Sequence, residues 1–452
     1  MVYQPPKEYF LRSAFPRGRM LSHIEDDLTI LVQLIARYAA SPKEKFDENI
    51  DREYAKLRSA SAKSIKNYRT EMTTLFGLVV VDEEGIVEAS SRTTTLIETQ
   101  NFHLFFKSFC NRFQFPNCIN KPQETVKQLE VSVKFKPAKF ILQLFLLGVK
   151  QCGEKFSLNG NEISNLVFND LRVTTGQAGP EVVLKRLLGL RRGKERFVGG
   201  SRMVQHGREF LGYMMLAKLL KQDGREFSLN VAELPAINSI IEDDNFFEIP
   251  KNYSTDPVVR KKIQTEWALW YGELSRLEIT KLTSAAGVIE TKITVGEEAV
   301  EFAQPAAEAL KEIGDKGEWI VLKYEKEKIA QIRPDKVSLV KIVSNDTELG
   351  YDIQSFEFED ISRKKFIEVK TTERTFPPAL DILTFFPMSS NEWETAKNYG
   401  QSYYIYRVFL MAAGSKMFII QDPVDKEKKG YIILEPLKYR VIVKKQAGDY
   451  IN

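Results

Sequence analysis

Two charged residues of the chain, Glu368 and Lys370, lie in the short run Phe-Ile-Glu-Val-Lys at positions 366–370. Side chains alternate along a β-strand, so these two charges are predicted to share one face while Ile367 and Val369 face a core. A charged pair in a sheet is costly unless a metal, a phosphate or another charge matches it. The run is therefore a candidate reaction site.

Asp352, which follows Gly-Tyr and precedes Glu368 by 16 positions, supplies a second carboxylate. Mg²⁺ prefers a few protein carboxylates together with waters and phosphate oxygens. Such an ion lowers the pKa of a bound water, and Lys370 can orient that water or stabilise charge on phosphorus. The pattern predicts phosphodiester hydrolysis, although an Asp followed by Glu-x-Lys also arises by chance in many chains.

A third carboxylate is expected from a helix that precedes these strands. Glu318 begins that predicted helix, and Glu325 shares its face seven residues later, so either side chain could complete the site. Both could instead be solvated helix charges.

The composition is that of an ordinary globular protein. The 452 residues predict two or three domains, with 43% hydrophobic and 28% charged residues and a net charge of +4. No 18-residue apolar run and no leader pattern occurs, which predicts a cytoplasmic protein without a membrane segment. Three cysteines and three histidines lack metal-ligand spacing, which argues against a structural zinc site or a disulfide framework.

The N-terminal region shows the same element order twice. Apolar spacing predicts three helices and then a β-hairpin, at residues 21–38, 42–57, 59–76 and 78–89. A looser copy follows, with helices at 161–171, 180–188 and 201–220, a turn at 222–224 and a strand from 227. Three helices followed by a hairpin is the order of a winged helix.

The C-terminal region is predicted to be an α/β unit. A helix leading to Gly314 and another over 318–329 precede the strands that carry Asp352 and Glu368. A capping box at 389–392 starts a helix that Gly400 ends, and further strands are predicted at 403–409, 416–420 and 431–434.

Several short blocks of this C-terminal region resemble the domain-of-unknown-function family 3883 (DUF3883), itself similar to the PD-(D/E)XK nucleases. They cover residues 317–318, 324–325, 350–355, 366–372, 391–393 and 403–408. The resemblance implies that Asp352, Glu368 and Lys370 form the catalytic triad and that Mg²⁺ is the cofactor. Asn391 or Gln401 is a candidate for contact with the substrate backbone, or a capping or surface group.

Residues 1 to about 275 resemble the DNA-recognition domains of the type IIS restriction endonuclease BpuJI family. Blocks at 3–20, 67–77 and 105–117 carry the resemblance, which implies two winged helices joined by an intervening element. The expected architecture is multidomain: a mainly α winged-helix DNA-recognition region followed by an α/β PD-(D/E)XK nuclease domain. The predicted parts are winged helix 1 at 1–100, an intervening subdomain at 101–155, winged helix 2 at 156–250, a helical connector at 251–297 and the nuclease domain at 298–452.

A winged helix inserts its third helix into the major groove, where Arg and Lys suit guanine and Asn and Gln suit adenine. Basic runs near the N-terminus and at 185–208 extend the predicted footprint. The candidate DNA contacts are Arg12, Arg17, Arg19, Lys63, Lys66, Asn67, Arg69, Arg191, Arg192, Lys194, Arg202, Gln205, His206 and Arg208.

Together these features predict a Mg²⁺-dependent, type IIS-like restriction endonuclease that cuts double-stranded DNA beside an asymmetric site. The predicted catalytic residues are Asp352, Glu368, Lys370 and Glu318, of which the three carboxylates hold the metal. Cutting both strands implies a transient homodimer, and a companion DNA methyltransferase is plausible. The alternatives are a modification-dependent or structure-specific nuclease and a DNA-binding regulator without catalysis.

Overall fold

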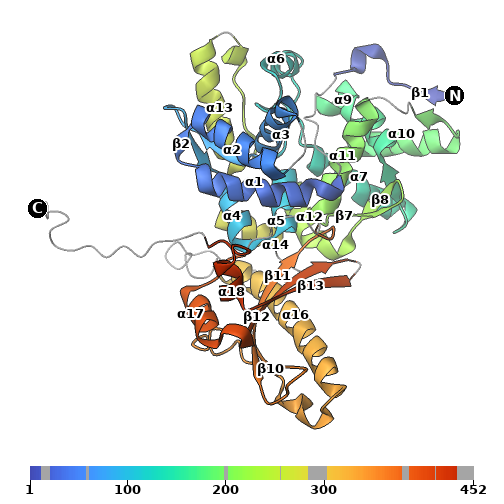
Figure 1. Ribbon diagram of the computed structural model, residues 1–452. Helices are drawn as coiled ribbons and strands as arrows, with labels where there is room; N and C mark the ends of the chain where they lie inside the picture. The colour runs from blue at the N-terminus through green and yellow to red at the C-terminus, as the bar shows by residue number, and fades with distance from the viewer. Residues whose placement is uncertain are drawn as a thin grey trace, which may run out of the picture. The chain divides into compact units, whose positions relative to one another are not determined.

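The computed structural model describes residues 1–11, 21–57, 61–197, 202–254, 256–283, 303–378, 386–412 and 414–434. The chain forms two compact units, Met1–Glu312 with Glu373–Thr384 and Ile313–Thr372 with Phe385–Asn452 (Figure 1). The first is mainly helical and the second contains a five-stranded sheet, so the expected multidomain class is confirmed. No helix among the described residues is long and apolar enough to cross a membrane.

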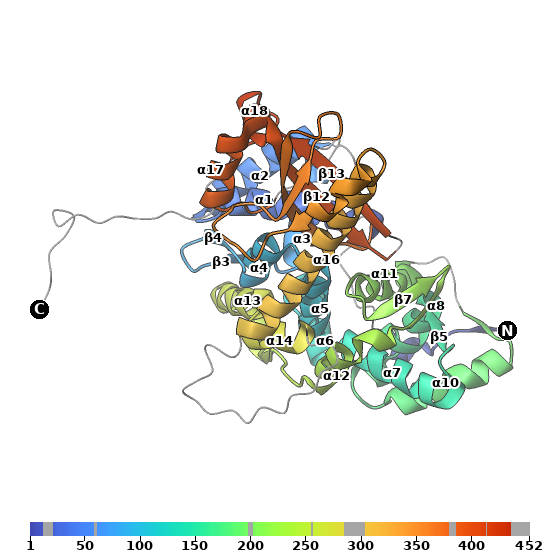
Figure 2. The same ribbon diagram turned by 90° about the horizontal axis from the view of Figure 1, so that it is seen from below.

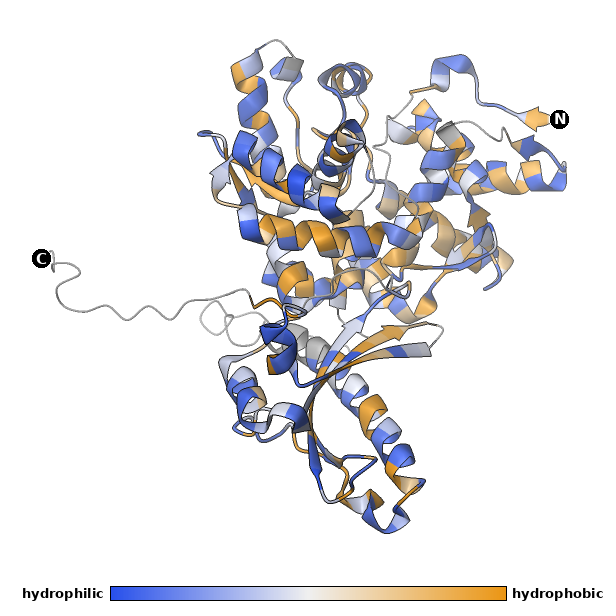
Figure 3. Cartoon of the chain, viewed as in Figure 1, coloured by the Kyte–Doolittle hydropathy of each residue, from blue (hydrophilic) through white to orange (hydrophobic). Residues whose placement is uncertain are grey.

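The first unit opens with the predicted three helices and hairpin. In chain order these are α1 (Ile24–Tyr38), β2 (Ser41–Pro42), α2 (Lys43–Leu57), α3 (Ala62–Leu75), β3 (Val79–Val81) and β4 (Ile86–Ala89). The short strand β2 pairs with β4, which gives the sheet order β2-β4-β3. Figure 3 shows α1 as the most apolar of the three helices, and most of its residues are buried because α2, α4 (Ser91–Thr99) and β4 pack against it.

The second copy of this pattern has the same sheet order. Strand β5 (Ser157–Asn159) pairs with β8 (Glu226–Leu229), which pairs with β7 (Leu220–Asp223). Helix α11 (Arg202–Leu216) directly precedes this hairpin, as α3 precedes the first one. Sequence spacing therefore located the first hairpin, the helix before each hairpin and strand β8 of the second, but it missed β7, where the predicted helix and turn extended too far.

The helix predicted over 161–171 is broken into three pieces. The structure has α8 (Gly160–Ile163), a π-helical turn (Ser164–Phe168) and α9 (Leu171–Thr174). The break occurs because Asp170 caps a new helix, with its carboxylate accepting a hydrogen bond from the Arg172 N–H at 3.1 Å. The other elements of this unit are α5 (Phe102–Arg112), α6 (Pro122–Glu130), α7 (Pro137–Cys152), α10 (Pro180–Arg192), α12 (Leu234–Glu242), α13 (Pro257–Gly272), α14 (Arg276–Thr283), β1 (Val2–Tyr3) and β6 (Arg196–Phe197).

Helix α5 is the centre of the first unit, and all of its residues are buried. Phe109 on α5 lies 5.1 Å from the ring of Phe76, which follows α3, and 5.4 Å from the ring of Tyr213 on α11. Edge-to-face aromatic pairs at these separations add to the energy of area burial. The intervening stretch thus joins the two repeated patterns through one shared aromatic core.

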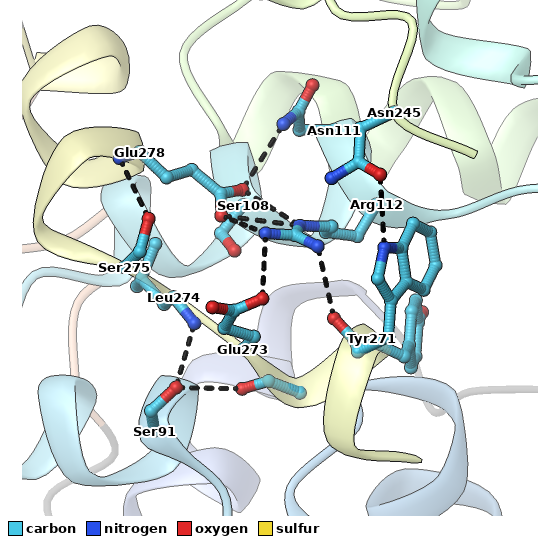
Figure 4. A network of polar contacts seen from close by, with 12 residues as sticks. Ser91, Ser108, Asn111, Arg112, Asn245, Tyr271, Glu273, Leu274, Ser275 and Glu278 are labelled. Atoms are coloured by element: carbon cyan, nitrogen blue, oxygen red, sulfur yellow. Dashed lines mark hydrogen bonds and ion pairs between the residues drawn. The ribbon is translucent and has the colours of Figure 1, made fainter. Parts of the chain in front are cut away.

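Helices α13 and α14, predicted as a connector, pack into the same unit. Figure 4 shows Arg112 at the end of α5 with Glu278 of α14, where the Nη2 to Oε2 distance is 2.9 Å. Arg112 also donates to the Trp270 carbonyl of α13 at 3.3 Å, and Ser91 of α4 accepts from the Leu274 N–H at 2.8 Å. These buried bonds attach α13 and α14 to α4 and α5, so this part of the chain is not a free linker.

The second unit is an α/β domain. Its five-stranded sheet has the strand order β13-β12-β11-β10-β9. Its strands are β9 (Lys341–Ile342), β10 (Ile353–Phe356), β11 (Lys364–Glu373), β12 (Tyr403–Met411) and β13 (Gly414–Gln421). Helix α16 (Ala303–Ala330) packs Val321 against Ile353 and Ile367 on one face. Helix α17 (Ser390–Tyr399) packs Ala396 against Phe366 on the other face (Figure 1, Figure 2).

The two helices predicted on either side of Gly314 are one continuous helix, α16. Gly314 has open space around it, whereas a Cβ on Gly317 would lie 1.8 Å from Thr371 Oγ1 of β11. Gly317 therefore permits close approach of helix and strand, and Gly314 does not end the helix as predicted.

Residues 431–434, predicted as a strand, form none. The chain passes instead from β13 into α18 (Pro423–Lys428), after which Tyr431 and Ile433 are exposed. Alternation predicted a strand there, but no strand partner pairs with these residues among those described.

Candidate functional site

Strands β10 and β11 bring the predicted triad together. They pair antiparallel with Ile353 opposite Ile367, and the Asp352 N–H donates to the Ile367 carbonyl at 2.9 Å. The Asp352 carboxylate then accepts a hydrogen bond from the Val369 N–H at 2.7 Å. Asp352 is thereby fixed beside Glu368, 16 positions away in the chain.

The predicted alternation of β11 is confirmed. Ile367 and Val369 belong to the core under α16, whereas Phe366 belongs to the core under α17. Glu368 and Lys370, in register with Phe366, therefore lie on the α17 face.

The two carboxyl groups of Asp352 and Glu368 crowd each other. Burial raises the pKa of Asp352, although the hydrogen bond from Val369 and the charge of Lys370 oppose this shift. Burial also raises the pKa of Glu368 well above its ordinary value, and the negative charges of Asp352 and Glu392 add to the shift. The site therefore holds more negative charge than its single lysine neutralises.

Lys370 lies between two glutamates. Its Nζ is 2.7 Å from Glu368 Oε1 and 2.9 Å from Glu392 Oε2. Burial opposes the charge on this ammonium, but the two carboxylates outweigh it and raise the pKa of Lys370. The side chain of Lys370 remains 15% exposed.

Sequence reasoning assigned Glu392 only to a capping box, and that capping box is confirmed. The Ser389 hydroxyl accepts from the Glu392 N–H at 3.2 Å, and Glu392 Oε2 accepts from the Ser389 N–H at 2.9 Å. The contact of Glu392 with Lys370 was missed, because nothing local in sequence relates α17 to β11.

The structure separates the two candidates for a helix carboxylate. Glu318 Oε2 accepts a hydrogen bond from Ser344 at 2.7 Å, and the residue before it, Val343, donates to the Asp352 carbonyl at 2.7 Å. Glu318 thus contacts the segment that follows β9 and borders Asp352. No three acidic, histidine or cysteine side chains in the described ranges gather closely enough to hold one ion, so a metal role for Glu318 stays a prediction.

Glu325 lies elsewhere, in a closed network on the α16 face of the sheet. Its Oε1 accepts from Lys365 at 3.0 Å and from the Tyr406 hydroxyl at 2.6 Å, and its Oε2 accepts from Ser355 at 2.7 Å. Glu325 is 1% exposed. Glu325 lies on the face of the sheet that Lys365 occupies, and β11 directs Glu368 to the opposite face. Glu325 is therefore not the helix carboxylate of the site.

The two polar candidates after the strands have structural contacts. Asn391 donates to the carbonyls of Thr347 and Glu348 at 3.1 and 3.2 Å. The Gln401 carbonyl accepts from Gln421 at 3.1 Å, and its side chain is exposed. Asn391 therefore secures the loop before Asp352.

In the first unit, α3 presents most of its predicted DNA contacts to solvent. Lys63, Lys66 and Asn67 are exposed, and the same face continues with Thr70. Arg69 is different, because it is 3% exposed and its guanidinium lies 2.6 Å from Asp47 and 2.7 Å from Asp51. Arg69 therefore fixes α3 to α2 and is not a DNA contact. Helical spacing put Arg69 beside Lys66, but α3 buries that position.

The second set of candidates divides in the same way. Arg208 is exposed on α11, whereas Gln205 is half-buried and donates to Glu209 at 2.6 Å. Arg191 is held by Glu162 at 2.7 Å, so that we assign it to the fold rather than to DNA. The remaining candidates are Arg192 and Lys194, both exposed, and His206, which is half-buried.

Four candidates cannot be placed. Arg12, Arg17 and Arg19 lie outside the described residues, and Arg202 begins α11 with a side chain that is not described.

Comparison with known proteins identifies two regions. A family profile described as "Protein NO VEIN, C-terminal" matches residues 317–420, which include Asp352, Glu368, Lys370 and Glu392. The relation of this region to DUF3883 and to PD-(D/E)XK nucleases stays a prediction. No curated protein matches the chain.

A second profile, described as "Restriction endonuclease BpuJI - N terminal", matches residues 3–271. A crystal structure of pyrene- and phenanthrene-modified DNA in complex with the BpuJ1 endonuclease binding domain is also similar. The alignment has 25% identity and a TM-score of 0.54, and it covers 59% of this chain and 99% of that chain. Because the profile spans more than half of the 452 residues, the chain belongs to the family of restriction endonuclease BpuJI N-terminal domains.

Proposed function

We propose that this protein is a Mg²⁺-dependent, type IIS-like restriction endonuclease that cuts double-stranded DNA near an asymmetric recognition site. Recognition is assigned to the first unit and cleavage to the second, which we take to be a PD-(D/E)XK nuclease domain of the DUF3883 type. The membership of the first unit in the BpuJI family supports a DNA substrate.

One observation carries the cleavage half of this proposal: the imbalance of charge around Lys370. Three carboxylates, those of Asp352, Glu368 and Glu392, act on one another electrostatically and share a single ammonium. When all three carboxylates are ionised, three negative charges and one positive charge leave an excess of two, which suits a hard divalent cation with oxygen ligands. Asp352 and Glu368 are the residues that would hold it.

The proposed chemistry assigns each side chain a task. Bound Mg²⁺ would supply Lewis acidity toward the phosphate and a water of lowered pKa. Lys370, whose side chain is 15% exposed, would orient the attacking water and stabilise the negative charge that develops on the phosphate. The hydrogen bond from Val369 fixes Asp352 so that its carboxylate need not reorganise.

The recognition half rests on the repeated pattern of the first unit. We propose that each copy is a winged helix and that α3 and α11 enter the major groove. On α3 the exposed Lys63, Lys66 and Asn67 would contact DNA, and on α11 Arg208 would do so. Lysine and arginine suit guanine, whereas asparagine suits adenine.

The same proposal has consequences for assembly. A single centre cuts one strand, so double-strand cleavage implies that two copies meet transiently on DNA. A sequence-specific nuclease acting in the cytoplasm also requires protection of the host DNA, for which a companion DNA methyltransferase is the expected partner.

The test is to digest a complex, unmethylated DNA with the full chain and Mg²⁺ and to sequence the ends produced. We expect ends at a fixed offset from one asymmetric sequence, and no ends when the Mg²⁺ is chelated. Cleavage restricted to methylated or branched DNA in parallel digests would favour the modification-dependent or structure-specific alternative. No cleavage of any substrate would favour the DNA-binding regulator.

Variants of the triad test the assignment of residues. Asp352→Ala, Glu368→Ala and Lys370→Ala should each abolish cleavage while the affinity for DNA, measured by gel shift in Ca²⁺, stays at the wild-type value. Glu348→Ala, which changes an exposed acid on the loop before Asp352, is the matched control and should cut normally. Retained cleavage by the triad variants in Mg²⁺ would show that the catalytic site does not lie on β10 and β11.

A further inference from the structure

Glu392 has two contacts at once, one with its own helix and one with the candidate catalytic lysine. Its Oε2 accepts from the Ser389 N–H at 2.9 Å and lies 2.9 Å from Lys370 Nζ. The Ser389 hydroxyl in turn accepts from the Glu392 N–H at 3.2 Å. The Ser389 N–H thus holds the Glu392 carboxylate, whereas the Ser389 hydroxyl holds only the main chain of α17.

We propose that Glu392 is a positioning residue that holds the ammonium of Lys370 in place for the reaction at Asp352 and Glu368. This inference rests on the proposed function, because it assigns Lys370 a part in cleavage. It adds a residue from the first turn of α17 to a site otherwise built on β10 and β11.

The need for such a residue follows from the other partner of Lys370. Glu368 lies 2.7 Å from Nζ, but Glu368 is also a candidate ligand for the cation. A carboxylate that coordinates a divalent cation attracts a neighbouring ammonium less strongly, because the cation offsets its negative charge. Glu392 is the acidic partner of Lys370 that is not assigned to the metal, so it can hold the lysine whether or not a cation is bound.

The main chain of Lys370 is fixed from the opposite side. Arg407 of β12 donates from Nη1 to the Lys370 carbonyl at 2.8 Å, and its guanidinium also contacts Thr372. The four-carbon side chain still has about 2 kcal/mol of rotamer entropy to lose, so a fixed backbone does not place the ammonium. Productive geometry requires placement within about 0.5 Å, and a partner at the end of the side chain provides it.

A capping box alone would explain why α17 begins with Glu392, so the test must separate that role from the contact with Lys370. Glu392→Gln removes the charge but keeps a side chain that capping boxes accept. Ser389→Ala removes the cap hydroxyl and leaves the Glu392 carboxylate intact. The two variants therefore perturb one contact each.

The first measurement uses the full-length, metal-free protein and needs no cleavage. Lysine side chains are acylated with a water-soluble ester, and the modification of each lysine is followed by mass spectrometry. We expect Glu392→Gln to raise the labelling rate of Lys370 severalfold, because Nζ has lost one of its two acidic partners. Ser389→Ala should leave that rate unchanged, and the buried Lys365 is an internal control that should not change in either variant.

The second measurement is cleavage of DNA in saturating Mg²⁺. Glu392→Gln should lower kcat about 10- to 100-fold, the range seen when a residue that supports a catalytic group is removed, with KM for DNA within twofold of wild type. Ser389→Ala should lower the melting temperature but leave kcat near the wild-type value below that temperature.

Unchanged Lys370 labelling in Glu392→Gln would overturn the inference, as would equal losses of kcat in the two variants. If the wild-type protein cuts no DNA at all, the proposed function fails. In that case a raised labelling rate of Lys370 in Glu392→Gln would still support the contact by which Glu392 positions the lysine.

Discussion

The sheet of the second unit carries one lysine–glutamate cluster on each face, and the two differ in how their charges are satisfied. Under α16, Lys365 and Glu325 are closed off with Tyr406 and Ser355, and both oxygens of Glu325 have partners. Under α17, Lys370 is shared by Glu368 and Glu392 and remains partly exposed. Lys365 and Lys370 belong to the same strand, β11.

The pKa shifts of the two lysines have opposite directions. Burial lowers the pKa of Lys365 despite the attraction of Glu325, whereas two glutamates raise the pKa of Lys370 against the effect of burial. A cluster with matched charges needs no further charge to complete it. A cluster with surplus negative charge is costly unless something positive binds there, and this difference distinguishes a candidate site from a structural ion pair.

The largest expected effect concerns Glu368. Glu368→Gln should reduce cleavage at least 10³-fold, because it removes a candidate metal ligand and one partner of Lys370. It should not lower the free energy of unfolding at pH 7, since the raised pKa of Glu368 shows that its charged form opposes folding. Cleavage assays and urea denaturation measure the two effects. A marked loss of stability would place Glu368 with the closed cluster instead.

The next effect should fall on stability alone. Glu325→Gln leaves the buried Lys365 without a matching charge, and breaking a buried pair in this way costs about 3–5 kcal/mol. The double variant Glu325→Leu with Lys365→Met should recover most of that loss, because apolar residues of similar size can replace a buried ion pair. Urea denaturation of the full chain would check this, and a loss of cleavage at full stability would contradict it.

A smaller effect should appear in the pH dependence of stability without metal. The pKa of Glu368 is raised in the folded state, so the unfolded chain releases this proton first as the pH rises above the ordinary value of 4.5. The stabilising contribution of the proton is complete below that value and is lost as the pH rises through the folded-state pKa. In the presence of a chelator, the melting temperature of the wild-type protein should therefore fall relative to that of Glu368→Gln as the pH rises from 5 to 8. Equal slopes for the two proteins would be the contrary result.

The smallest effect extends the comparison to α3, where Lys66 is exposed and Arg69 is paired with Asp47 and Asp51. Lys66→Ala should weaken DNA binding. If Lys66 contacts a phosphate, the substitution should also reduce the slope of the logarithm of the DNA-binding constant against the logarithm of salt concentration by about 0.9. Arg69→Ala should lower stability, since it removes the ion pairs of the buried guanidinium with Asp47 and Asp51. Binding isotherms at several salt concentrations, measured below the melting temperature of each variant, distinguish the two roles.

Local patterns predicted much of the secondary structure because they depend on neighbours along the chain. Periodicity located α1, α2, α3 and the first hairpin, and the alternation of 366–370 assigned Glu368 and Ile367 to opposite faces. Local patterns failed where contacts with residues distant in the sequence determine the extent of a helix or the burial of a side chain. Helix α16 runs on through Gly314 and packs Gly317 against Thr371 of β11, and Arg69 is buried where α2 supplies two aspartates.

The sequence by itself determined the residue types of the site, their faces on β11 and the order of the elements, because strand alternation and helix periodicity are local properties. Only the tertiary structure separated Glu318 from Glu325 and brought Glu392 to Lys370. The reason is that Coulomb attraction and hydrogen bonding depend on distance in space. Residues 22 positions apart meet only after α17 has packed on the sheet.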